Sequence, residues 1–64
     1  MTEIAERVSR YVERHPGCDA GEVRLGVPAL RGVTDRVLER LTRAGFLEVR
    51  DGRYRAFKPY RVAS

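Results

Sequence analysis

The residues best suited to chemistry are basic side chains interleaved with aromatic ones near the C-terminal end. Of 64 residues, 13 are arginine or lysine and nine are acidic, a net charge of +4. Residues 1–42 carry seven of each sign, so the excess lies in residues 43–64, together with four of the five aromatic residues. Such a mixture favours a phosphate-bearing partner. A solvated charged surface is the alternative interpretation.

Other chemistry has little support in the sequence. Cys18 is the only cysteine and His15 the only histidine, so neither a disulfide nor a cluster of metal ligands is expected. We interpret Cys18 as a small apolar core or loop residue and His15 as a helix end. No carboxylate is paired with a histidine or cysteine, and no glycine loop could cradle phosphate. We therefore predict no catalytic site, no metal, no cofactor and no small-molecule ligand.

The length allows one domain with a small core. No apolar run is long enough to span a membrane, and no signal peptide is visible. The prediction is a cytoplasmic protein with no membrane partner.

A helix is predicted in the middle of the chain from an apolar stripe at helical spacing. The stripe consists of Leu30, Val33, Val37, Leu41 and Ala44. Gly45 follows where a glycine commonly ends a helix. The start is open: the helix could begin at Pro28, or near Val33 with Gly32 or Thr34 at its beginning.

A β-hairpin is predicted directly after this helix. Two strand-like runs, residues 46–50 and 53–57, flank Asp51-Gly52, a strong signal for a two-residue turn. This turn sets Val49 opposite Tyr54, Glu48 opposite Arg55 and Leu47 opposite Ala56. Leu47, Val49, Tyr54 and Ala56 would then pack on the helices, and Glu48, Arg50, Arg53 and Arg55 would point outward.

Two further helices are predicted before residue 27. The first ends at His15-Pro16-Gly17, since proline disfavours helix at the preceding residue. Its buried stripe would be Ile4, Val8, Tyr11, Val12 and His15. Asp19 and Glu22 have the spacing of a capping box for a short helix over residues 20–25, with Val23 inward.

Three helices are followed by a hairpin, and the run Leu41-Thr42-Arg43-Ala44-Gly45-Phe46-Leu47 precedes the Asp51-Gly52 turn. In this order and this run the chain resembles prokaryotic winged helix-turn-helix DNA-binding domains. The resemblance covers nearly the whole chain and departs from the family between Gly26 and Thr34. It implies an α+β, mainly α fold of three helices with a two-stranded wing. The domain would be residues 1–58 and the tail residues 59–64, with Tyr60 folded back onto the core.

The resemblance also implies where DNA would be contacted. The third helix would enter the major groove, with Arg31, Asp35 and Arg36 nearest the bases. The arginines could donate to guanine and Asp35 could accept from cytosine; the chain has no asparagine or glutamine for adenine. G·C pairs or DNA shape would then set specificity. Backbone or minor-groove contacts would come from Arg43, Arg50, Arg53, Arg55 and Lys58. Glu39, on the same helix face, would repel phosphate unless paired with Arg43.

The function implied is binding of double-stranded DNA by a small transcriptional regulator associated with the nucleoid. A homodimer would let such a regulator bind two half-sites. The alternative is a winged-helix module that docks onto protein within a larger nucleic-acid-processing complex, through an apolar patch including Phe57 and Tyr60. RNA binding is a third, weaker alternative.

Overall fold

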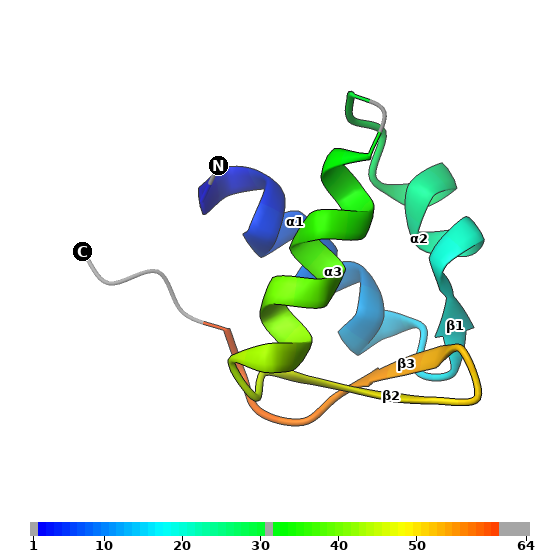
Figure 1. Cartoon of the computed structure of the whole chain (residues 1–64), viewed down its shortest axis with the longest axis vertical. Helices are drawn as coiled ribbons and strands as arrows, with labels where there is room; N and C mark the ends of the chain where they lie inside the picture. The colour runs from blue at the N-terminus through cyan, green and yellow to red at the C-terminus, as the bar shows by residue number, and fades with distance from the viewer. Residues whose placement is uncertain (1, 31, 61–64) are drawn as a thin grey trace.

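The chain forms a small α+β domain of three helices and a three-stranded antiparallel sheet (Figure 1). The computed structural model describes residues 2–30 and 32–60, so Arg31 and the last four residues of the predicted tail lie outside the described residues. The elements are α1 Thr2–Arg14, β1 Cys18–Asp19, α2 Ala20–Gly26, α3 Val33–Arg43, β2 Leu47–Arg50 and β3 Arg53–Ala56. The predicted class and the three helices are confirmed.

The predicted two-stranded hairpin belongs to a larger sheet, because β1, which was not predicted, adds a third strand in the order β1-β3-β2. Cys18 lies opposite Tyr54, and Asp19 lies opposite Arg53. The Gly17 amide extends this pairing by donating to the Tyr54 carbonyl at 2.8 Å. A strand of two residues is too short to show the apolar alternation that identifies strands in a sequence.

The predicted hairpin register is confirmed. Leu47, Glu48 and Val49 lie opposite Ala56, Arg55 and Tyr54. Asp51 and Gly52 both have positive φ angles, +54° and +76°. These angles belong to a type I′ turn, whose twist matches that of the flanking strands.

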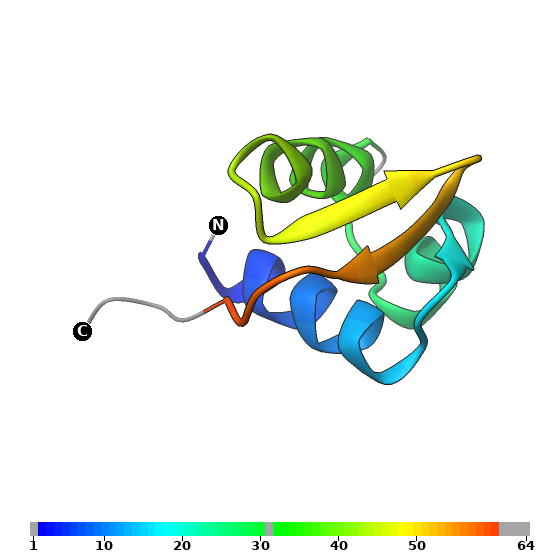
Figure 2. The same cartoon turned by 90° about the horizontal axis from the view of Figure 1, so that it is seen from below.

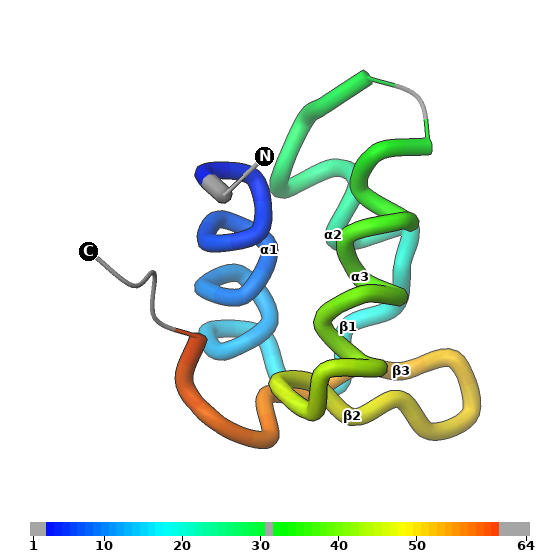
Figure 3. Tube along the Cα trace, turned by 60° about the vertical axis from the view of Figure 1, so that its left-hand side comes forward, coloured from blue at the N-terminus to red at the C-terminus, as the bar shows by residue number. Residues whose placement is uncertain are grey.

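Only part of the predicted inner face of the hairpin is covered by the helices. Leu47 is buried and Tyr54 half-buried, as predicted. Val49 is 44% exposed and Ala56 is also exposed, so for these two residues the prediction is wrong. The hairpin projects past the helices towards its tip, as Figure 3 shows, and Val49 is two residues from the Asp51-Gly52 turn at that tip.

Helix α1 packs on the core through Val8 and Val12, which are fully buried, with Ile4 and Tyr11 half-buried beside them. The prediction that His15 continues this stripe is wrong. His15 is exposed because α1 ends at Arg14, and its ring lies against Tyr11 with 4.3 Å between centroids.

The predicted capping box at the start of α2 is confirmed. The Glu22 amide donates to Asp19 Oδ1 at 2.8 Å, and the Asp19 amide donates to Glu22 Oε1 at 3.0 Å. These bonds satisfy two amides that a helix start would otherwise leave unpaired. Val23 is buried, as predicted.

Helix α3 begins at Val33 with Gly32 as its N-cap, which is the later of the two predicted starts. The buried Thr34 hydroxyl donates to the Val27 carbonyl at 3.3 Å and ties the α2–α3 connection to the helix. The predicted stripe is therefore partly wrong. Leu30 precedes the helix and is 83% exposed, Ala44 is exposed at the C-cap, and Leu38 is the most buried residue of α3 at 1%.

The predicted glycine stop after α3 is confirmed. Gly45 has φ +89°, a left-handed conformation that favours glycine. The Gly45 amide donates to the Thr42 carbonyl at 3.1 Å, and the Phe46 amide donates to the Leu41 carbonyl at 2.9 Å. This pair of bonds is a Schellman motif, and it directs the chain straight into β2.

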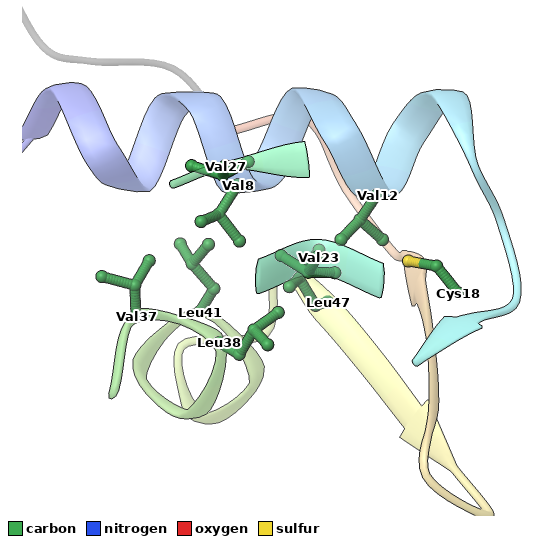
Figure 4. Packing of buried hydrophobic residues seen from close by; sticks show 9 residues of the cluster. All are labelled: Val8, Val12, Cys18, Val23, Val27, Val37, Leu38, Leu41 and Leu47. Atoms are coloured by element: carbon green, nitrogen blue, oxygen red, sulfur yellow. The ribbon is translucent and has the colours of Figure 1, made fainter. Parts of the chain in front are cut away.

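The core lies between α1, α2, α3 and the sheet (Figure 4). Its members are Val8, Val12, Cys18, Val23, Val27, Val37, Leu38, Leu41 and Leu47. Cys18 lies in this core, which is one of the two locations predicted for it. Burial raises the pKa of the Cys18 thiol, and the negative charge of the nearby Glu22 raises it further.

A core this small makes stability sensitive to single truncations. A chain of 64 residues has an unfolding free energy of about 3–10 kcal/mol. Leu38→Ala should lower it by about 2–5 kcal/mol, because the cavity would lie among fully packed neighbours. Leu30→Ala, the matched control at an exposed leucine, should change it by less than about 0.5 kcal/mol. Urea unfolding followed by circular dichroism measures both, and equal losses would contradict this core.

Candidate nucleic-acid interface

The exposed side of α3 carries charges arranged in two rows. Asp35 and Glu39 are four residues apart and form an acidic row. Arg36, Arg40 and Arg43, spaced by four and three residues, form a basic row beside it. All five residues are exposed. Arg40 was not among the predicted contacts.

Both carboxylates of the acidic row are neutralised by arginines. Arg24 Nη1 donates to Asp35 Oδ2 at 2.9 Å and to Oδ1 at 3.2 Å. Arg43 Nη2 lies 3.3 Å from Glu39 Oε1, the pairing that the sequence allowed. Asp35, a predicted base-contact residue, is therefore engaged with Arg24 of α2. Arg24 was missed because a contact between two helices leaves no periodic pattern in the sequence.

The hairpin presents its arginines on the face away from α3. Arg50 and Arg53 lie opposite each other next to the turn, and Arg53 Nη1 donates to the Gly17 carbonyl at 3.2 Å. Arg55 Nε donates to Glu48 Oε1 at 2.9 Å, which neutralises that carboxylate. A hollow of about 290 Å³ on this face is lined by Gly17, Glu48, Arg50, Asp51, Arg53, Tyr54 and Arg55. Guanidinium groups around such a hollow can donate to phosphate oxygens.

The segment after β3 returns to the C-terminal end of α3. Lys58 Nζ lies 4.9 Å from the centroid of the Phe46 ring, a cation–π distance. Tyr60 packs edge-on against the same ring at 5.0 Å, so the prediction that it folds back is confirmed. Of the predicted apolar docking patch, only Phe57 is well exposed, since Tyr60 is half-buried.

A groove of about 470 Å³ separates the inner side of the hairpin from the helices. Its lining residues are Ala20, Arg24, Asp35, Glu39, Thr42, Arg43, Val49 and Tyr54. The structure therefore brings two predicted contacts, Asp35 and Arg43, to one groove. The opposite side of the hairpin carries Arg50, Arg53 and Arg55. Arg36 belongs to the basic row of α3.

The positive charge that remains after ion pairing is unevenly distributed. Of the 13 arginines and lysines, two lie outside the described residues and five have an acidic partner within 4.0 Å. The other six are Arg14, Arg36, Arg40, Arg50, Arg53 and Lys58. All but Arg14 belong to α3, the hairpin or the segment just after it.

Within residues 2–30 and 32–60, no group of three or more histidine, cysteine, aspartate or glutamate side chains is placed so that it could hold a metal ion. None of the helices formed by these residues has the length and apolar character needed to cross a membrane.

Comparison with known proteins finds no matching family model, no matching curated protein and no matching solved structure. The candidate interface therefore rests on the geometry of its own residues.

The acidic row of α3 should weaken binding of any polyanion. Glu39→Gln removes one negative charge and releases Arg43, so the affinity for duplex DNA should rise by about 2- to 5-fold at low salt. Fluorescence anisotropy with a labelled duplex measures this change. Stability should change by less than about 0.5 kcal/mol, since an exposed ion pair contributes little.

Glu3→Gln is the matched control for Glu39→Gln. Glu3 forms the same kind of helical ion pair, with Arg7 at 3.0 Å, but on α1. Glu3→Gln changes the net charge by the same amount as Glu39→Gln, but away from the interface. It should therefore change the affinity for duplex DNA less than Glu39→Gln does. An equal rise in both variants would show that only net charge matters and would contradict the interface.

Proposed function

We propose that this chain is a winged-helix domain that binds double-stranded DNA, as a small cytoplasmic transcriptional regulator. In this proposal α3 enters the major groove and the hairpin is the wing, on the backbone or in the minor groove. The order of three helices and a hairpin, with the antiparallel sheet, is compatible with a winged helix.

The observation that supports DNA most strongly is the position of the unneutralised positive charge. Five of the six basic side chains that have no acidic partner in the described residues lie on α3, on the hairpin or just after it. The main attraction between proteins and DNA is to the phosphate backbone, so such a surface favours a polyanion. Ion pairs on the acidic row of α3 remove most of the opposing charge.

The dimensions of α3 suit this role. Its 11 residues make a rod about 16 Å long, and the diameter of an α-helix with its side chains, about 10–12 Å, fits the DNA major groove, which is about 12 Å wide. Arg36, in the first half of α3, is exposed and would donate to guanine. Arg43, Arg50, Arg53, Arg55 and Lys58 would contact phosphates and fix the orientation of the domain.

A homodimer is part of the proposal for a stand-alone regulator, because one domain of this size covers a single half-site. β2 is an edge strand of the sheet and is hydrogen-bonded on one side only among the described strands. Either this edge or α1 would supply the contact between two copies.

The test is an anisotropy titration of random-sequence duplex DNA at two salt concentrations. About four to six phosphate contacts should make log K fall with log salt at a slope of roughly −4 to −5. Arg53→Ala should weaken binding to all sequences and reduce this slope by about 1. Arg36→Ala should also relax the preference at one base position.

Arg14→Ala is the control, since Arg14 also has no acidic partner in the described residues but lies on α1. It should leave the slope nearly unchanged. No binding at low salt, or an equal effect of all three variants, would contradict the proposal.

A second candidate function is docking onto another protein. Leu25, in the last turn of α2, and Leu30, in the segment that follows α2, are 85% and 83% exposed. Exposed leucines of this kind favour an apolar partner. This function predicts that DNA binding is absent even at low salt.

A further inference from the structure

We propose that Arg24 contacts a guanine in the DNA major groove and that Asp35 holds the Arg24 guanidinium in position for this contact. The inference rests on the proposed DNA binding and adds to it a specificity-determining residue from α2. Arg24 lies in the last turn of α2, and Asp35 lies in the first turn of α3. The pair therefore joins the two helices at the end of α3 that would approach the bases.

The hydrogen bonds leave part of the guanidinium available. Both oxygens of Asp35 accept from a single nitrogen, Arg24 Nη1, at 3.2 and 2.9 Å. These are the only hydrogen bonds of the Arg24 side chain within residues 2–30 and 32–60. A guanidinium has five N–H donors in one plane, so the adjacent donors of Nε and Nη2 remain for a ligand. Guanine presents two adjacent acceptors, N7 and O6, which match such a fork.

The ion pair also fixes the orientation of the fork. A free arginine loses considerable side-chain entropy when it binds, and prior anchoring reduces that loss. Asp35 is a suitable anchor because it belongs to the first turn of α3, where the helix dipole favours a negative charge. In its pairing with Arg24, Asp35 acts as a positioning residue, and the direct base contact belongs to the arginine.

The surroundings keep the pair accessible to a large ligand. Arg24 and Asp35 line two separate hollows, the groove of about 470 Å³ beside the hairpin and one of about 640 Å³ beside the α2–α3 connection. The pair therefore forms a ridge between the two hollows. Both side chains are about half exposed, 54% and 47%, so a base edge can reach them.

The pair also removes an electrostatic obstacle. An unpaired Asp35 would repel the DNA backbone at the end of α3 that should come closest to it. Arg24 neutralises that charge and supplies the donors for guanine. One contact thus serves both affinity and specificity.

The test begins with selection of bound duplexes from a pool with a randomised core, using the wild-type protein. The measured quantity is the ratio of affinities for the selected duplex and for one with a single G·C pair changed. At the guanine contacted by Arg24 this ratio should be about 5- to 100-fold. Arg24→Lys keeps the charge and loses the fork, so the ratio should fall close to 1. Affinity for random duplex should stay within about 2-fold, because the charge is unchanged.

Asp35→Ala and Glu39→Ala form a matched pair that separates positioning from charge. Each removes one carboxylate from the acidic row, so each should raise affinity for random duplex by about 2- to 5-fold. Only Asp35→Ala should lower the ratio at that guanine, because only Asp35 holds Arg24. Circular dichroism melting confirms that both variants are folded.

The outcomes separate this inference from the proposed function. A guanine preference that is lost in Arg24→Lys and kept in Arg14→Lys supports the inference. Survival in Arg24→Lys of the preference at every selected G·C pair, or DNA binding with no sequence preference, overturns the inference and leaves DNA binding in place. Absence of wild-type binding to any duplex at low salt overturns both.

Discussion

The position of the hairpin relative to the helices depends on a strand of only two residues, Cys18–Asp19. The Cys18 side chain lies in the core, and its backbone pairs with Tyr54 of β3. The Asp19 side chain caps α2, and the preceding Gly17 carbonyl accepts from Arg53. In Figure 2, β2 lies nearer α3 and β3 nearer α1, so the sheet joins the two long helices. Because the core is small, the pairing of β1 with β3 contributes substantially to holding the hairpin against the helices.

The second organising constraint is electrostatic. One side of helix α3 is buried in the core, so the charged residues of the helix lie on its exposed side, where acidic and basic side chains are close together. Both acidic side chains on this side form ion pairs within the molecule: Arg24 neutralises Asp35, and Arg43 neutralises Glu39. Apart from Arg14 on α1, the basic side chains that have no acidic partner in the described residues lie on α3, near the tip of the hairpin and just after β3. A surface of this kind favours a polyanion without the acidic row preventing close approach.

The features that the sequence predicted correctly are local ones. The register of the hairpin follows from two turn residues, the capping box from two side chains three residues apart, and the end of α3 from Gly45. The errors concern contacts between distant segments. Strand β1 exists only through its pairing with β3, and Leu30 has helical spacing although the chain turns at Gly32. For the candidate site, the sequence analysis named the other basic residues of α3 and the hairpin, but neither Arg40 nor Arg24, whose ion pair with Asp35 depends on how α2 packs against α3.

The proposed DNA-facing surface consists of α3 and the hairpin together. Amide chemical-shift mapping of the isotope-labelled protein, titrated with a short duplex, tests this proposal most directly. We expect the largest shifts in α3 and around Asp51-Gly52, with small shifts at exposed α1 residues such as Arg10 and Glu13. Shifts concentrated on α1, or none at a salt concentration of about 50 mM, where phosphate contacts are strongest, would contradict it.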